Sequence, residues 1–410
     1  MFTVIVKIHP DFSCHFTRLI MYSGILLVFT CYVVAVTAQA PPFKETCVHG
    51  SYPPSKSRDV PEYTINLDDP PSQRWNKVAS DKRNEMRNIL EAFKSFISEF
   101  GEFASAVIYY IDLLGPGIID IIPQPYQDEL KGISNVTGIE LGEVILYNIF
   151  YEIFTVCTSV IAENTAGELY HARNLDFGLF MGWDVKNRTW SITEKLRPAI
   201  VNIKWMKNGK LLYKSVNYVG YVGILTGISP GRFTLSMNER FNIDGGYLGL
   251  IELLFTGKGT WMSFLTRDTM EQAESFNEAL NMLTSKQLIA PAYFILGGNK
   301  TKQGCVITRS REVNGTDIWY MSDKSAGGWY VLETNYDHWK APLFLDDRRT
   351  PANICMKNMK QKGVGIPGIF DVLSSKPVLN KLTTYTAIMQ VNSGHLETWL
   401  QYCEDPCAPW

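Results

Sequence analysis

The chain has 410 residues, of which 46% are hydrophobic and 20% are charged. This composition is typical of globular proteins, and the length is sufficient for one large or two medium domains with a packed core. The formal net charge of -2, together with the lack of a Lys/Arg run interleaved with aromatic residues, argues against a nucleic-acid partner.

The first forty residues have the pattern of a secretory signal. Basic residues precede an apolar run over 19–36, which ends in the small-x-small motif Ala38-Gln39-Ala40. We therefore expect residues 1–40 to be removed by cleavage after Ala40. The apolar run approaches the length of a membrane span, so a signal anchor is the alternative.

Sequons and cysteines also favour the secretory route. The four N-x-S/T sequons begin at Asn135, Asn187, Asn299 and Asn314. After the signal, six cysteines remain, which is compatible with two disulfides and two free thiols. Cys403 and Cys407 enclose only three residues, and we expect a local disulfide between them. The alternative is half of a zinc site, but the chain has no CxxC or HExxH partner, so we expect no metal.

Helical patterning extends from residue 76 to about residue 154. Its first helix has an apolar face at Met86, Leu90, Phe93, Ile97 and Phe100. A more apolar segment over 104–122 is interrupted by Asp and Gly-Pro, which favours a buried or lipid-surface helix pair over a membrane span. A third apolar helix, over 141–154, runs almost to Cys157.

After Cys157 the pattern changes to short strands with Gly and Asn turns. Asn208-Gly209 predicts a tight hairpin, followed by at least two further strands. Helical sequence returns around 269–285. Strands are again predicted at "AYFILGG", "GCVITRS" and "WYVLETNY". The sequence thus predicts a helical N-terminal third followed by an α+β segment.

The α+β segment opens with a predicted hairpin, in which the polar turn "ENTAG" joins strands over 158–162 and 168–173. A pair centred on this turn places Cys157 opposite Arg173, to within one or two residues of register. Asp176 then lies just past the point where the strand ends meet. A thiol, a guanidinium and a carboxylate are therefore expected together.

Cys157 has two interpretations. A mid-chain cysteine is commonly a small buried hydrophobe. As a nucleophile it needs a thiolate, which Arg173 favours by lowering the thiol pKa, and it needs a base, which no local signature supplies. His171 lies on a strand and is expected to pack or form hydrogen bonds. Cleavage of the Val156–Cys157 bond at the helix-to-strand change supplies the base, because the new α-amino group can accept the thiol proton.

The stretch "CTSVIAENTAGELYHARNLDFG" resembles the start of the catalytic subunit in the acid ceramidase and N-acylethanolamine amidase family of cysteine N-terminal nucleophile hydrolases. Segments such as "YVGYVGILTG", "APAYFILGGN", "ETNYDHWK" and "SSKPVLNKLTTYT" are similar to family segments in the same order, so the resemblance covers nearly everything after the signal. It implies that Cys157 is the nucleophile and new N-terminus, and that Arg173 and Asp176 position and activate it.

The resemblance implies roles for three more residues. Asn335 in "ETNYDHW" matches the Asn on the oxyanion side, Arg348 in "DDRR" a second active-site Arg, and Glu239 in "MNERF" an acidic residue implicated in processing. Without the family, Asn335 is a turn residue, Arg348 is part of a surface ion-pair cluster, and Glu239 is half of an exposed pair with Arg240.

The resemblance also implies an αββα sandwich of α+β class, with residues 41–156 as a helical α-subunit and 157–410 as the catalytic β-subunit. A Cys47–Cys355 disulfide is expected to join the two subunits. No cofactor is expected. The implied location is the lysosome, with secretion as a second destination.

The implied reaction is hydrolysis of ceramide at a membrane surface, with a saposin-type lipid-binding activator as a candidate partner. "NERFNIDGGYLGLIELL" and the terminal "CEDPC" resemble the ceramidase branch, and residues 109–122 together with the Gly-rich loop are candidates for an apolar substrate surface. Hydrolysis of N-acylethanolamines by the same residues is one alternative. A non-enzymatic secreted lipid-binding protein with an inert Cys157 is the other.

Overall fold

The computed structural model describes residues 47–98, 119–153, 155–177, 182–240, 259–323 and 327–407. The expected signal segment, most of the apolar segment over 104–122 and most of the Gly-rich loop after Glu239 lie outside the described residues. No helix in the described ranges is both long and apolar enough to cross a membrane.

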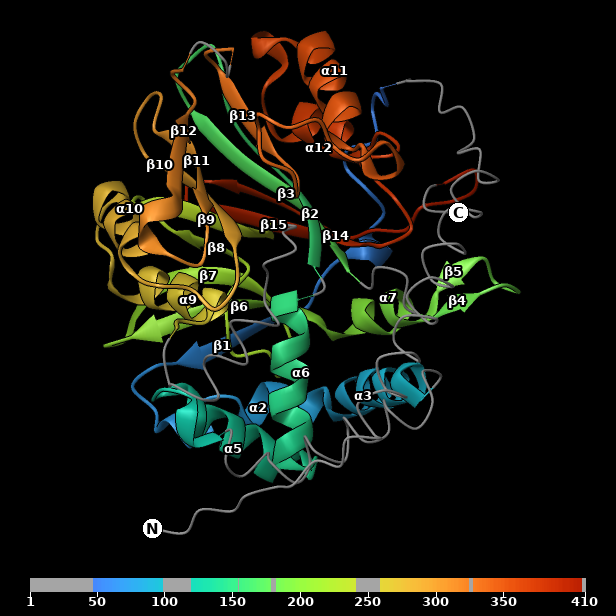
Figure 1. Cartoon of the computed structure of the whole chain (residues 1–410), viewed down its shortest axis with the longest axis vertical. Helices are drawn as coiled ribbons and strands as arrows, with labels where there is room; N and C mark the ends of the chain where they lie inside the picture. Colours follow the sequence, from blue (N-terminus) through green and yellow to red (C-terminus); the bar gives the residue numbers. More distant parts are fainter. Residues whose placement is uncertain are drawn as a thin grey trace, which may run out of the picture. The chain divides into compact units, whose positions relative to one another are not determined.

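Two stacked sheets form the centre of the fold (Figure 1). The eight-stranded sheet contains, in spatial order, β1 (Glu62–Asn66), β6 (Ile200–Lys207), β7 (Lys210–Tyr218), β8 (Thr226–Ser229), β9 (Phe233–Glu239), β10 (Ala292–Gly298), β11 (Gly304–Arg309) and β12 (Thr316–Tyr320). The five-stranded sheet contains β13 (Tyr330–Glu333), β2 (Thr155–Glu163), β3 (Leu169–Phe177), β14 (Thr383–Gln390) and β15 (His395–Leu400). A separate pair consists of β4 (Trp183–Asp184) and β5 (Thr189–Trp190).

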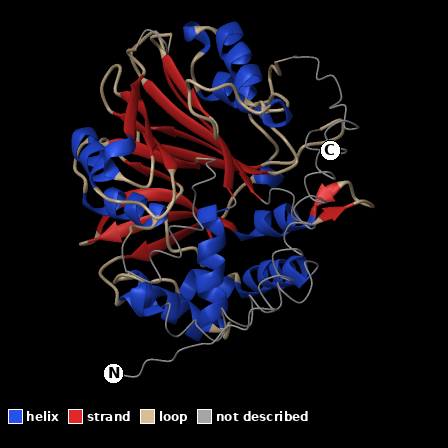
Figure 2. Ribbon diagram, viewed as in Figure 1, coloured by secondary structure: helices blue, strands red, loops and turns tan. Residues whose placement is uncertain are grey.

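Helices cover both outer faces of the sandwich (Figure 2). On the eight-stranded sheet lie α9 (Met262–Gln272) and α10 (Phe276–Ser285), and on the five-stranded sheet lie α11 (Arg349–Met359) and α12 (Ile366–Ser374). Within the described ranges, the remaining helices of four or more residues are α2 (Asn76–Asp81), α3 (Arg83–Ser98), α5 (Tyr126–Thr137), α6 (Leu141–Ile153) and α7 (Ser191–Leu196). The predicted αββα architecture is therefore confirmed.

The alternation of side chains along β2 explains how the layers are held together. Ile161 points between the two sheets and packs with apolar residues of β10, β11 and β13. Val160 and Ala162 point outward and pack under α11 and α12. Because both faces of the strand are buried, its pairing register is strongly specified.

Several local predictions are confirmed. Met86, Leu90 and Phe93 of α3 are buried, whereas the side chains of Ile97 and Phe100 lie outside the described set. The Asn208-Gly209 hairpin joins β6 to β7 with positive φ at both residues, 51° and 71°. The second helical region begins earlier than predicted, since α9 starts at Met262 rather than near residue 269.

The cysteine pattern is also confirmed. The structure contains the Cys47–Cys355 and Cys403–Cys407 disulfides, and the free thiols in the described chain are those of Cys157 and Cys305. The four sequon asparagines, Asn135, Asn187, Asn299 and Asn314, are all exposed. Exposure makes each of them accessible to a glycosyltransferase, and their modification stays a prediction.

Candidate active site

Cys157 is the third residue of β2 and lies on the face that points between the sheets. Its side chain is 0% exposed and belongs to the large apolar core. The preceding helix α6 ends at Ile153, and β2 begins at Thr155. The helix-to-strand change therefore comes two residues before the Val156–Cys157 bond, which is itself inside the strand.

The register of the hairpin differs from the predicted pairing by two residues. Cys157 lies opposite Leu175, and Arg173 lies opposite Ser159. The turn has the predicted length but lies one residue further along the chain, because β2 continues to Glu163 and β3 starts at Leu169. All four paired residues share one face, and Arg173 is long enough to reach the diagonal neighbour.

Arg173 contacts the thiol directly and is itself held from the other sheet. Its Nη2 donates to Cys157 Sγ. Its Nη1 donates to the carbonyl oxygen of Leu225 at 2.7 Å and to Thr226 Oγ1 at 3.1 Å. The guanidinium is fully buried, so its orientation is fixed by these partners.

The thiol of Cys157 is nevertheless protonated in the uncut chain. Burial raises its pKa to about 11, although the nearby cation of Arg173 acts to lower it. Arg173 thus acts on the thiol pKa in the predicted direction, but in the uncut chain desolvation outweighs its charge. Activation requires a further change at the site.

Asp176 lies opposite Val156, on the face of β3 that points away from the thiol. Its Oδ2 accepts hydrogen bonds from Asn380 Nδ2 at 3.0 Å and from Arg348 Nη1 at 3.3 Å. Its Oδ1 is buried without a hydrogen-bond partner in the described chain. Asp176 therefore adjoins the backbone at the Val156–Cys157 bond rather than the sulfur atom.

Asn335 and Arg348 hold the backbone of Cys157. Asn335 Oδ1 accepts from the Cys157 amide nitrogen at 2.9 Å. Arg348 donates from Nη1 to the Cys157 carbonyl oxygen at 2.6 Å and from Nη2 to Asn335 Oδ1 at 2.8 Å. Both side chains are buried, with 0% and 2% exposure for the residues, so neither the turn nor the surface-cluster interpretation describes them.

Glu239 ends β9 and is half-buried rather than exposed. Its carbonyl oxygen accepts from Asn335 Nδ2 at 2.7 Å, and its negative charge acts to raise the pKa of Cys157. The alternative of an exposed pair with Arg240 does not describe Glu239, because Glu239 is half-buried and Arg240 binds Asp337, at 2.7 Å from Nε to Oδ1. The six predicted residues thus meet at the start of β2.

His171 is not a base for this site. Its ring nitrogens hydrogen-bond Thr234 Oγ1 at 2.9 Å and Ser236 Oγ at 2.8 Å. Burial lowers its pKa to about 3, so the ring is neutral except in strong acid. The described residues contain no group of three or more His, Cys, Asp or Glu side chains that could hold a metal ion.

Comparison with known proteins decides the family. The chain is 48% identical to the acid ceramidase of Homo sapiens over 380 residues, which is 92% of this chain and 95% of that protein. It is likewise 48% identical to the acid ceramidase of Pan troglodytes over 380 residues, with the same coverage. The chain belongs to the acid ceramidase family.

Two sequence models of protein families match on either side of the candidate nucleophile. The linear amide C–N hydrolases of the choloylglycine hydrolase family match residues 157–353, beginning at Cys157. The β subunit of N-acylethanolamine-hydrolyzing acid amidase matches residues 58–115. As a member of the acid ceramidase family the chain is an amide hydrolase, which excludes the non-enzymatic alternative.

A solved structure agrees with this assignment. The Caenorhabditis elegans orthologue of N-acylethanolamine-hydrolyzing acid amidase has 29% sequence identity and a TM-score of 0.50, and the match covers 60% of this chain and 100% of that chain. The N-terminal nucleophile hydrolase fold predicted for this acid ceramidase family member is thereby confirmed.

Sequence reasoning did not single out two residues of this site. Asn380 donates to Asp176, and Asn238 accepts from Ser159 Oγ at 2.8 Å and donates to the Thr334 carbonyl oxygen at 2.9 Å. Both asparagines lie in segments that resemble the family. Neither has a charge or spacing that distinguishes it from a turn or strand residue, so only their packing identifies them.

Proposed function

We propose that this chain hydrolyses ceramide to sphingosine and a fatty acid, with Cys157 as the nucleophile after self-cleavage at Val156–Cys157. The observation that carries the proposal is that the buried thiol of Cys157 accepts a hydrogen bond from Arg173. The chain that holds this thiol is 48% identical to acid ceramidases over almost its full length. The acid ceramidase relatives support a lysosomal location. A saposin-type activator remains part of the proposal.

The proposed self-cleavage proceeds by attack of Cys157 Sγ on the Val156 carbonyl carbon. A carbon–sulfur bond forms, the peptide carbon–nitrogen bond breaks, and the thiol proton ends on the new amine. Water then hydrolyses the thioester and releases Val156 as a carboxylate. The thiol is protonated in the uncut chain, so the first step needs a proton acceptor. Glu239 is the proposed acceptor, because the charge of Glu239 acts on the Cys157 thiol.

In the mature enzyme the new α-amino group serves as the base. It takes the thiol proton during attack on the substrate amide and returns it to the leaving amine. The positive charge of the new α-ammonium group favours the thiolate form of Cys157. The uncut chain has no such group at this position. Asn335 is the proposed oxyanion donor, and this role requires its Nδ2 to exchange the Glu239 carbonyl oxygen for the substrate oxygen.

Substitution of Cys157 by Ala tests the nucleophile. Cys157→Ala is expected to accumulate as a single uncut chain without amidase activity, as resolved by denaturing electrophoresis and N-terminal sequencing. The matched control is Cys305→Ala, which removes the other buried free thiol and should leave cleavage intact. Spontaneous cleavage of the Cys157→Ala chain at the same bond would contradict the proposal.

N-acylethanolamine hydrolysis is the second candidate, favoured by the match to the Caenorhabditis elegans amidase. The test gives purified mature protein equal C12-ceramide and N-palmitoylethanolamine in mixed anionic micelles at mildly acidic pH. We expect faster release of sphingosine. Faster release of ethanolamine across the tested pH range would reverse the substrate assignment while leaving the nucleophile and the fold untouched.

A further inference from the structure

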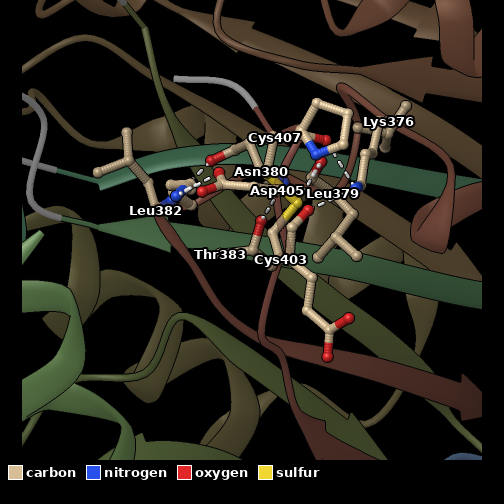
Figure 3. Close-up of a disulfide and its surroundings, with 12 residues drawn as sticks. Lys376, Leu379, Asn380, Leu382, Thr383, Cys403, Asp405 and Cys407 are labelled. Atoms are coloured by element: carbon tan, nitrogen blue, oxygen red, sulfur yellow. Dashed lines mark hydrogen bonds and ion pairs between the residues drawn. A yellow bond between two sulfur atoms is a disulfide. The ribbon is translucent and has the colours of Figure 1, made fainter. Parts of the chain in front are cut away.

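The terminal loop, residues 403–407, packs against a turn over residues 376–383 (Figure 3). Lys376 donates from Nζ to two carbonyl oxygens of the terminal loop, at 2.6 and 2.7 Å. Lys381 forms an ion pair with Asp405, 2.7 Å from Nζ to Oδ1. The ammonium groups of Lys376 and Lys381 are thus held by the terminal loop, which the Cys403–Cys407 disulfide closes.

Asn380 lies in this turn and is 4% exposed. Its Oδ1 accepts from the backbone nitrogen of Leu382 at 2.9 Å, so its Nδ2 is the atom that faces Asp176, at 3.0 Å from Oδ2. Its own backbone nitrogen donates to Thr383 Oγ1 at 3.1 Å. The side-chain amide has one orientation, and that orientation presents a donor to the carboxylate.

We propose that Asn380 is a positioning residue, whose amide keeps Asp176 as an oriented carboxylate beside the amine of Cys157, and that the terminal loop holds Asn380 in place. This inference rests on the proposed function, because it requires Cys157 to become an N-terminus. Asn380 acts through Asp176 and is not proposed to touch substrate.

The direction of the effect follows from the groups around Asp176. Burial raises the pKa of this carboxyl, while Arg348, Thr383 and Asn380 act to lower it. Of the other titratable groups nearby, Asp346 acts to raise this pKa, and the thiol of Cys157 lies on the opposite face of the sheet. Removal of the Asn380 donor therefore raises the pKa of Asp176, and the acid limb of activity moves to higher pH.

The test is the pH profile of purified mature Asn380→Ala against wild type. Loss of a hydrogen bond to a charged group is expected to lower kcat about tenfold to a hundredfold, with KM unchanged. The acid limb of the pH profile of kcat is expected to move to higher pH by about one unit. If the variant stays uncut, the pH dependence of self-cleavage of the purified chain is measured instead, and the same upward shift is expected.

Matched variants separate positioning from folding. Asn202→Ala removes a side-chain amide outside the site, which accepts a hydrogen bond from Thr398 Oγ1 at 2.7 Å, and should lower stability without moving the acid limb. Asp405→Ala should shift the limb in the same direction as Asn380→Ala, with kcat lower by about two- to fivefold. Asp405→Glu should restore the wild-type profile.

An Asn380→Ala protein with a lower melting temperature and an unmoved acid limb would overturn the positioning role. Wild-type behaviour of Asp405→Ala would overturn the part assigned to the terminal loop. Failure of the proposed function has a different signature, because the wild-type protein measured in parallel would then release no sphingosine.

Discussion

Arg173 and Cys157 show how burial and charge compete at one atom. The guanidinium touches the sulfur, but the pKa of the thiol is still raised to about 11, because desolvation is the largest influence. Under the proposed self-cleavage, the protonated thiol of the uncut chain is protected from alkylation and oxidation until cleavage adds the ammonium. The low reactivity belongs to the uncut chain and not to the residue.

The planar fork of Arg173 is expected to be essential. Arg173→Lys keeps the charge but cannot contact Cys157, Leu225 and Thr226 together, so we expect loss of most ceramide hydrolysis. Turnover of the purified, folded variant is the measurement.

The control for this substitution is Arg309→Lys. Arg309 is also fully buried, and its guanidinium donates to the carbonyl oxygens of Leu283 and Lys286, outside the candidate site. This variant should lose stability and keep its turnover per folded molecule. Near-normal turnover of Arg173→Lys would return Arg173 to a purely structural role.

At the scale of elements, a buried ion pair joins the N-terminal helices to the catalytic part. Arg267 of α9 donates to both carboxylate oxygens of Glu129 on α5, at 2.5 and 2.7 Å, and both residues are 0% exposed. The guanidinium also lies over the rings of Trp205 and Tyr126. The helices are therefore tied to the sandwich by more than the Cys47–Cys355 disulfide.

Removal of one partner is expected to be costly. Glu129→Ala removes the carboxylate that both Nη atoms of the buried Arg267 bind and leaves Arg267 with its ion pair to Glu271, 2.8 Å from Nε to Oε1, so we expect the free energy of unfolding to fall by about 3 kcal/mol. Urea denaturation of the uncut Cys157→Ala background measures it, so that cleavage does not complicate the transition.

The control for Glu129→Ala is Glu62→Ala, which breaks the exposed Lys204–Glu62 pair. It should leave the denaturation midpoint almost unchanged, because exposed ion pairs contribute little. Equal effects of the two substitutions would show that the α5–α9 pair does not hold the helices.

At the scale of the whole molecule, the buried carboxyl of Glu333 favours the folded state in acid. Burial raises the pKa of Glu333 to about 8, and the ordinary value is 4.5. The folded chain therefore holds a proton that the unfolded chain has lost between these values, and stability falls as pH rises from about 4.5 to about 8. This direction suits a protein of an acidic compartment.

We expect Glu333→Gln to remove this part of the pH dependence. The melting temperature of the wild type should fall between pH 5 and pH 8, whereas that of the variant should fall less.

His171 contributes to stability in the opposite sense, since its pKa is lowered to about 3 and its stabilising contribution is lost as pH falls from 6.5. Parallel melting curves for His171→Gln separate the two groups, and identical slopes in wild type and Glu333→Gln would refute the assignment.

The sequence by itself predicted many of the elements and the candidate nucleophile. Hydrophobic spacing located α3 and α6, Asn208-Gly209 located a hairpin, and the motif around Cys157 placed the chain in its family. These features depend on local periodicity, on the φ > 0 preference of a few residue types, or on residues adjacent in the chain. Local information was sufficient for them.

Only the tertiary structure decided the register and the long-range contacts. A turn composition does not fix which residues pair, so Cys157 came to lie opposite Leu175 and not Arg173. Asp176 and the thiol project to opposite faces of the sheet, which follows from the alternation of side chains along the strands and holds for the predicted and the observed register alike. The partners of Asp176 are Arg348 and Asn380, which are more than 170 residues away in the chain. They reach Asp176 because α11 packs on the five-stranded sheet and β14 pairs with β3 within it. Desolvation, which sets the pKa of Cys157, is a property of that packing and has no signature in sequence.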